Sequence, residues 1–243
     1  QIWAQVNNDD IPLQKSLQVS SGVLFNKNNW KIDIEPYYKK VSGMTSQTSG
    51  YNDQTDDFSN GEGKVFGIDM LINKKFNNYR TWVNYSYTKN KFKFLDLENK
   101  YFPANHDITN YFSWSHAYKL NNYEFSLGWI YRTGNPYTAV KEFYTDDNGT
   151  PHINLDSDNI NALRLPNYSR LDASMTYSFN FSEKWKGKLG FSLLNIFNKK
   201  NILDRTYELK IVNNPGNIEE QKLVKTDRLS LGFTPNVVFR LSF

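Results

Sequence analysis

The feature that most constrains this chain is an alternation of apolar and polar residues that lasts longer than a soluble strand needs. It is clearest in residues 229–243, LSLGFTPNVVFRLSF, where every second residue is apolar. A strand of a soluble sheet usually runs for about 5 to 6 residues, whereas a tilted strand that crosses a bilayer takes about 9 to 11. The length of the pattern therefore indicates a membrane-spanning strand.

The same alternation recurs along the chain and leaves almost no helical periodicity. Its segments lie around residues 17–25, 30–38, 66–72, 81–87, 108–118, 123–131, 171–181, 189–197 and 229–243. The face opposite the apolar one is strongly polar, as in Lys31, Asp33 and Glu35, and three charges on one face cannot pack into a small dry core. The sequence predicts an all-β, antiparallel transmembrane β-barrel segment of about nine long strands.

Composition fits that class and excludes several others. Aromatic residues make up 16% of the chain although the mean hydropathy is −0.67, and no apolar run is long enough for a transmembrane helix. The chain contains no Cys, which excludes disulfides, thiol catalysis and thiolate metal sites. The net charge of +4 is spread along the chain without a basic block, so nucleic acid is not an expected partner.

Connections alternate between short and long. Short turns are expected near residues 26–29, 77–78, 121–122 and 182–187, and long loops near 41–62, 94–106, 134–168 and 199–226. Short turns on the periplasmic side and long loops outside are typical of outer-membrane barrels. Pro36 is the difficulty, because it removes a ladder donor from a strand that should be fully paired; a bulge or a strand end there would accommodate it.

Nine strands cannot close a bacterial single-chain barrel, whose strand number is even, and an open edge is not tolerated in lipid. The chain also begins at Gln1 without an initiator Met or a signal-peptide pattern. We therefore expect residues 1–243 to be a fragment or processed product, the C-terminal portion of a larger barrel. The alternative fold is a soluble β-sandwich or propeller, for which shorter strands would be expected.

Several motifs along the chain resemble the C-terminal barrel of TonB-dependent outer-membrane receptors, in particular the carboxypeptidase-like-plug and SusC-like branches. They are "WKIDIEPYYKKVSGM" from Trp30, "GEGKVFGIDMLINKKF" from Gly61, "FPANHDITN" from Phe102, "YRTGNPYT" from Tyr131 and "LGFSLLNIFNKKN" from Leu189. His106 precedes Asp107, whereas the usual pattern has the His after the Asp, so no role is assigned to His106.

The resemblance implies a barrel of about 22 strands with an N-terminal plug domain and a TonB-contacting segment, neither of which is present in residues 1–243. It implies outer-membrane lipid, the plug, the TonB energy complex and the barrel-assembly machinery as partners, and allows a surface lipoprotein lid.

Three groups of residues are then candidates for function. Lumen- or plug-facing candidates are Asp33, Glu35, Asp69, Arg80, Asn84, Arg170 and Asp172. Candidates at the external ligand mouth are Tyr51, Asp53, Phe143, Tyr144 and Asp146. Candidates for the assembly signal are Phe239, Leu241 and Phe243, and a charge at Phe243 is expected to reduce insertion far more than a charge at Ser242.

Chemistry beyond binding has little support in the sequence. The three His residues, at positions 106, 116 and 152, form no catalytic spacing with Ser and Asp, and the segments "TDDNGT" from Thr145 and "DSDNIN" from Asp156 lack the ligand spacing of a calcium loop. We expect no catalytic residue, cofactor or metal.

The hypothesis is an outer-membrane receptor that imports a scarce solute (a glycan, peptide, metal chelate or cofactor) with TonB-transduced energy. The alternatives are a passive channel, a stand-alone small barrel, less readily a barrel hydrolase, or a soluble secreted β-domain.

Overall fold

The computed structural model describes residues 11–47, 58–146, 150–214 and 218–243. Within them, the elements are β1 (Lys15–Ser20), β2 (Val23–Lys27), β3 (Trp30–Gln47), β4 (Phe58–Phe76), β5 (Tyr79–Phe94), β6 (Glu98–Pro103), β7 (Asn110–Leu120), β8 (Tyr123–Arg132), β9 (Pro136–Tyr137), β10 (Val140–Thr145), β11 (Pro151–Leu155), the 3₁₀ turn η1 (Ser157–Asn159), β12 (Leu163–Arg164), β13 (Tyr168–Asn180), β14 (Lys186–Leu194), β15 (Ile202–Asn214), β16 (Ile218–Leu229) and β17 (Thr234–Ser242). Among these described residues, no helix is both long and apolar enough to cross a membrane.

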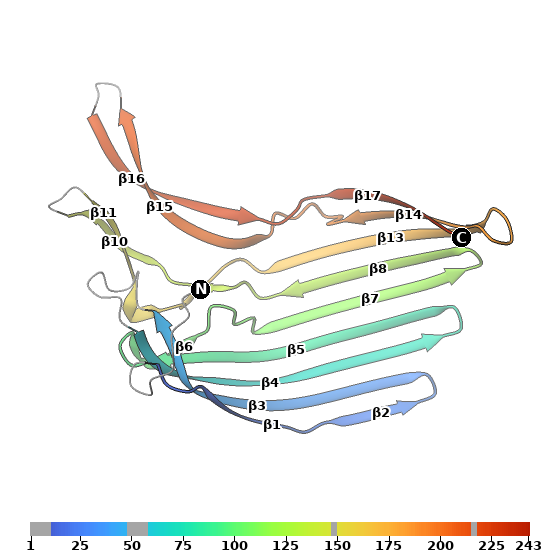
Figure 1. The fold of residues 1–243 in the computed structure, drawn as a ribbon, viewed down its shortest axis with the longest axis horizontal. Coiled ribbons are helices and arrows are strands. Elements are labelled where there is room, and N and C mark those ends of the chain that lie inside the picture. The colour runs from blue at the N-terminus through green and yellow to red at the C-terminus, as the bar shows by residue number, and fades with distance from the viewer. Residues whose placement is uncertain (1–10, 48–57, 147–149, 215–217) are drawn as a thin grey trace.

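One antiparallel sheet dominates the molecule, with its strands side by side in chain order (Figure 1). The order is β1-β3-β4-β5-β7-β8-β13-β14-β17, which confirms the predicted set of about nine strands. The turns β2–β3, β4–β5, β7–β8 and β13–β14 lie at one end, the short-turn end, and the longer connections lie at the other, the long-loop end (Figure 1). Within the described residues β1 and β17 do not pair with each other, so this stretch of wall is not closed.

The tight turns depend on Asn. Asn28, Asn29, Asn77 and Asn121 all have positive φ, between 23° and 61°. Two-residue hairpins need residues in this region, and Asn enters it at lower cost than most L residues because its short amide can bond to nearby backbone. The sequence clusters at these positions therefore set where each strand pair reverses.

Pro36 interrupts the neighbouring strand and leaves β3 continuous. β1 ends at Ser20, which pairs with Tyr37, and β2 begins at Val23, which pairs with Ile34. The missing N–H of Pro36 falls in this gap, where only its carbonyl is used, by the Ser21 amide at 3.2 Å. The expected break is thus found in the partner strand.

The two faces of the sheet differ as the alternation predicts. Large apolar side chains stand unpacked on one face, the outer face, including Leu17, Val23, Phe66, Leu127 and Phe239, each at least 41% exposed. The buried core is small, consisting of Phe94, Phe102 and Ile160 at the long-loop end. A continuous apolar face of this size marks a membrane or protein contact, and the polar residues of each strand lie on the opposite, inner face.

The structure differs from the prediction in three of the expected loops and at the start of the last strand. The sheet extends through residues 41–47 and 58–62, which were expected to be loop, because strands continue past the apolar band and lose the alternation there. The expected loops 134–168 and 199–226 contain the hairpins β10–β11 and β15–β16. The final strand is also shorter than its pattern: it starts at Thr234, since the amide of Phe233 donates to the Asn198 side chain at 3.0 Å and residues 230–233 form the return from β16.

Candidate ligand-binding site

A hollow of about 590 Å³ lies at the long-loop end, where connections from several strands meet. We call it the mouth hollow; its lining residues are Asn105, His106, Asn135, Pro136, Tyr137, Thr138, Ile153, Leu155, Asn161, Leu165, Asp204, Arg205, Thr206 and Tyr207. Its volume is within the range of about 300 to 1,000 Å³ that small-ligand sites occupy.

A short ladder and a buried amide fix one side of the mouth hollow. β9 pairs with β12 through Tyr137 and Leu163. Asn161, which is 5% exposed, donates through Nδ2 to the Pro103 carbonyl at 2.9 Å and to Asn105 Oδ1 at 2.7 Å. Its backbone N–H donates to Thr138 Oγ1 at 3.0 Å. Asn161 therefore joins its own segment to Thr138 in the same connection and to Pro103 and Asn105 in the connection before β7.

Arg205 ties the β15–β16 hairpin to this ladder. Its Nε and Nη2 donate to the two carboxylate oxygens of Asp227 at 2.7 and 2.9 Å, and its Nη1 donates to the Tyr137 hydroxyl at 3.0 Å. The hydrogen bonds that Arg205 donates to Asp227 raise the pKa of Arg205 and lower the pKa of Asp227. Both groups are charged at neutral pH, and the bidentate geometry fixes their orientation.

Two polar side chains of the mouth hollow are available to a ligand, whereas the amides of Asn135 and Asn161 are bonded to the protein. Within the described residues, neither the exposed His106 nor the half-buried Tyr207 has a hydrogen-bond partner. Asp204 lies 3.7 Å from Arg228, so the charged groups are balanced in pairs. The hollow thus offers an imidazole, a phenol and aromatic faces without a net charge of either sign.

None of the predicted mouth residues that the structure describes lines this hollow, but Phe143, Tyr144 and Asp146 belong to the β10–β11 hairpin and its tip, and Ile153 and Leu155 of that hairpin line it. Tyr51 and Asp53 fall outside the described residues. Phe143 is on the same face of the β10–β11 hairpin as Ile153, its partner in the register, and Ile153 lines the hollow. Tyr144 is on the other face, where its ring stacks on His152 at 5.2 Å.

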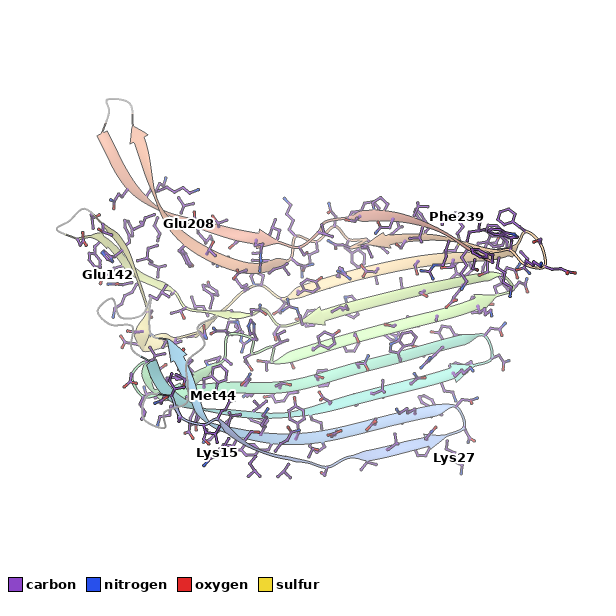
Figure 2. The ribbon with its side chains drawn as sticks, in the orientation of Figure 1. Lys15, Lys27, Met44, Glu142, Glu208 and Phe239 are labelled. Atoms are coloured by element: carbon purple, nitrogen blue, oxygen red, sulfur yellow. The ribbon has the colours of Figure 1, made fainter. Side chains whose placement is uncertain are left out.

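Asp146 is bonded at the tip of the same hairpin, where its carboxylate lies 3.2 Å from His152 Nε2 and accepts the Thr150 amide at 2.7 Å. Glu142 and Glu208 mark the two hairpins, which project at the same end of the molecule (Figure 2). A hydrogen bond of 2.6 Å from Thr145 to Gln221 joins the hairpins.

Four of the predicted lumen-facing residues surround one hollow on the inner face, of about 210 Å³. They are Asp33, Glu35, Asp69 and Asn84. Asp69 is bonded to Ser86 at 2.5 Å and Asn84 to Ser113 at 3.0 Å. Asp33 and Glu35 have no hydrogen-bond or ion-pair partner in the part of the chain that the structure describes. The sheet therefore presents a cluster of carboxylates that the described residues do not neutralise.

The other three predicted lumen residues have partners in the wall. Arg80 lies 5.3 Å from the Trp82 ring. Arg170 and Asp172 form an ion pair at 2.8 Å, and Asp172 also accepts the backbone amide of the buried Asn195 at 2.8 Å.

The candidates for the assembly signal lie on β17 or directly after it. Phe239, Leu241 and Phe243 are exposed by 60%, 45% and 94%, with Phe243 next to Trp185 at 5.2 Å.

Sequence reasoning missed most of the mouth hollow. It assigned no role to His106 and did not single out Tyr137, Arg205 or Tyr207. These residues come from connections far apart in the chain, and no local spacing signals that they meet. Two signals were available, the resemblances of "YRTGNPYT" and "FPANHDITN", because the first motif contains Tyr137 and the second contains His106.

Comparison with known proteins identifies the family to which the sheet belongs. A family model described as TonB dependent receptor-like, beta-barrel matches residues 1–198. No curated protein matches the chain.

The sheet is also similar to solved structures. The ferric citrate transporter FecA in its unliganded form has a TM-score of 0.63 at 12% identity, with 94% of this chain and 31% of that chain covered. The FrpB iron transporter from Neisseria meningitidis has a TM-score of 0.62 at 15% identity, with 96% and 32% covered. The ferric-catecholate import receptor Fiu from K12 E. coli has a TM-score of 0.55 at 12% identity, with 100% and 30% covered. The chain spans about a third of the length of these proteins, and identities this low show a shared fold.

Proposed function

Since the chain belongs to the family of TonB-dependent receptor-like β-barrels, we propose that it forms part of a receptor that binds a scarce solute outside the cell and imports it with TonB-transduced energy. Barrels of this family lie in the outer membrane of Gram-negative bacteria, and the chain is an outer-membrane protein. The short-turn end is then periplasmic and the long-loop end extracellular. The mouth hollow is the observation that carries the proposal. It lies at the long-loop end, where solute would arrive, and the side chains of His106 and Tyr207 line it.

Among glycans, peptides, metal chelates and cofactors, a metal chelate is the solute that we propose first. The similar structures include a ferric citrate transporter, an iron transporter, a ferric-catecholate import receptor and a copper transporter. The chemistry of the hollow is compatible with this choice, since a phenol and an imidazole bind oxygen-rich, planar chelates by hydrogen bonds and ring contacts.

The carboxylates of the inner face have a separate role in this proposal. Asp33, Glu35 and Asp69 would face cationic side chains of a plug domain, which would neutralise them in the lumen. Without such a partner, three neighbouring carboxylates repel one another. When TonB pulls on the plug, these ion pairs would break and water would hydrate the carboxylates.

The test is uptake of radiolabelled ferric chelates, citrate and catecholate, by cells that express the whole receptor. Wild type is expected to take up at least one chelate, and collapse of the proton gradient is expected to abolish uptake. His106→Ala and Tyr207→Ala are expected to weaken binding by about 10-fold each, since each removes a hydrogen bond to the ligand. His116→Ala, which changes a His on the outer face near the short-turn end, is the matched control and is expected to leave binding unchanged.

Two outcomes separate the alternatives. Uptake that persists without a proton gradient would support a passive channel. Equal binding by the His106, Tyr207 and His116 variants would remove the mouth hollow from the proposal and leave Phe143, Tyr144 and Asp146 as the residues to test.

A further inference from the structure

Lysines are concentrated on the outer face of the first strands, just beyond the apolar band. Phe66 on β4 pairs with Lys89 on β5; in the next row Lys40, Lys64 and Lys91 are neighbours; and in the row after that Lys15, Ser42, Glu62 and Lys93 follow one another. We call Lys15, Lys40, Lys64, Lys89, Lys91 and Lys93 the lysine belt. Lys15 lies at the long-loop end of β1 (Figure 2).

The lysine belt is confined to the outer face of β1, β3, β4 and β5. In "KNKFKF", from Lys89, the lysines lie on the outer face while the alternate Phe92 and Phe94 pack inward near the small core. At the same end of the outer face, β7, β8 and β13 have the neutral residues Asn110, Tyr131 and Ser169. The lysines therefore do not reflect a generally basic surface.

Few groups in the structure neutralise the belt. Glu62 is 3.4 Å from Lys40 and also accepts a hydrogen bond from Tyr101, while Lys64 lies 4.2 Å over the Tyr101 ring. Within the described residues, Lys91 and Lys93 have no carboxylate partner. Among the described residues, six cations facing one carboxylate leave a surplus of positive charge, which favours an anionic partner.

The height of the belt specifies where that partner lies. Phe76, beside the periplasmic turn, and Phe66, at the lower edge of the belt, are separated by about ten residues of β4. That spacing corresponds to about 33 Å along the strand and to about 25 Å along the membrane normal at a typical tilt, which equals the apolar band of an outer-membrane barrel. Tyr38 pairs with Phe66, and the Tyr87 ring lies 6.3 Å from the Phe66 ring, so these three residues form the aromatic cluster expected at the interface. Lys89 is in the same row as Phe66, and the other lysines of the belt follow in the next two rows.

We propose that the lysine belt binds the phosphate groups of the phosphorylated glycolipid in the extracellular leaflet. Lysine clusters adjacent to a membrane surface attract anionic headgroups, and the aromatic cluster would contact the upper acyl chains. The bound lipid would cover the outer face of β1–β5 and leave the lumen and the mouth hollow accessible.

The test measures binding of bisphosphorylated lipid A to the whole purified receptor in detergent at low salt, with dephosphorylated lipid A and inorganic phosphate as separate arms. The variant Lys89→Gln/Lys91→Gln/Lys93→Gln is expected to bind on the order of 100-fold more weakly than wild type. Wild type is expected to prefer the bisphosphorylated lipid by a similar factor, and 10-fold excess inorganic phosphate is not expected to displace it.

Two matched variants make the result decisive. Lys210→Gln/Lys222→Gln/Lys225→Gln removes the same charge from the exposed β15–β16 hairpin and is expected to bind as wild type does. Lys89→Arg/Lys91→Arg/Lys93→Arg keeps the charge and is expected to retain binding, which separates charge from a folding defect. Equal binding by the two Gln variants, equal binding of the dephosphorylated lipid, or displacement by inorganic phosphate would each overturn the proposal.

Discussion

At the scale of single residues, two of the motifs meet in one buried clamp. Asp107 is 4% exposed; its carboxylate accepts the Asn90 amide at 2.7 Å and also contacts Arg164. Arg164 Nη1 donates to the backbone carbonyl of Asp107 at 2.7 Å and to that of Gly134 at 3.2 Å. Asp107 is in "FPANHDITN" and Gly134 is in "YRTGNPYT", so the clamp gives both motifs a structural role in supporting the mouth hollow.

Gly134 allows this clamp to close. A Cβ at this position would lie 1.8 Å from the Leu165 carbonyl oxygen, which is backbone and cannot move aside. Gly134→Ala is expected to lower the free energy of unfolding by about 1–3 kcal/mol, measured by urea denaturation in detergent. The control is Gly128→Ala on β8, where the new Cβ would meet only Ser115 Oγ at 3.7 Å. Equal destabilisation by the two substitutions would contradict the clamp.

The Arg205–Asp227 pair predicts a pH dependence of the β15–β16 hairpin. The pKa of Asp227 is below its usual value of 3.8 because Arg205 donates hydrogen bonds to the ionised carboxylate. A carboxyl with a lowered pKa contributes stability above its unfolded-state pKa, and that stability is lost as the pH falls through the folded-state pKa. Pepsin is therefore expected to cleave the hairpin faster as the pH drops below about 4, relative to an unstructured peptide. Asp227→Asn is expected to be cleaved rapidly throughout, and an unchanged pH profile in that variant would rule the pair out as the cause.

At the scale of elements, the effect of a charged substitution on membrane insertion depends on the face of the strand that the residue occupies. Phe239 on β17 is on the outer face, 60% exposed, and Val238 beside it is on the inner face, 55% exposed. In the outer membrane, Phe239→Asp is expected to cost about 2–4 kcal/mol if that position is deep in the bilayer and to reduce the amount of inserted receptor, whereas Val238→Asp is expected to be tolerated. Heat-modifiable migration in outer-membrane fractions measures both. Similar insertion of the two variants would contradict the assignment of faces.

The elements that could be predicted from sequence are those whose signal is local. Alternation identified the strands that cross the bilayer, and Asn pairs identified their turns, since both depend on near neighbours. The missing N–H of Pro36 predicted a bulge or a strand end at that residue, whereas the structure keeps β3 continuous and interrupts the neighbouring strand between β1 and β2. The β15–β16 hairpin was not predicted, because only β15 alternates, through Tyr207, Leu209 and Ile211, and β16 has no matching apolar face. The mouth hollow was not predicted because His106, Tyr137 and Arg205 are brought together only by the tertiary fold.

At the scale of the whole molecule, the sheet has an outer face for lipid and an inner face for water, and its two ends differ in the length of their connections. Between Phe76 and Phe66 the outer face of β4 is apolar except for Lys74, whose ammonium lies 4.7 Å over the Trp30 ring, and beyond Phe66 it is basic. The inner face carries the carboxylates around Asp33 and Glu35. Strands in lipid must satisfy every backbone group, and the continuous ladders from β1 to β17 do so for all but the two edges. The loops of the extracellular end assemble the mouth hollow, so the proposed solute site and the proposed lipid site are on different surfaces of the molecule.

The measurement that tests this account most directly is a spin-label scan of β13 in outer-membrane vesicles that contain the whole receptor. The chain has no Cys, so single Cys variants from Leu171 to Phe179 can be labelled at chosen positions of this segment. The account predicts a strict period of two: labels at Leu171, Ala173, Met175, Tyr177 and Phe179 are accessible to oxygen from the lipid, and labels at Asp172, Ser174, Thr176 and Ser178 are accessible to a water-soluble nickel chelate. Equal accessibility of both sets to the nickel chelate would show that this wall does not face lipid and would contradict the account.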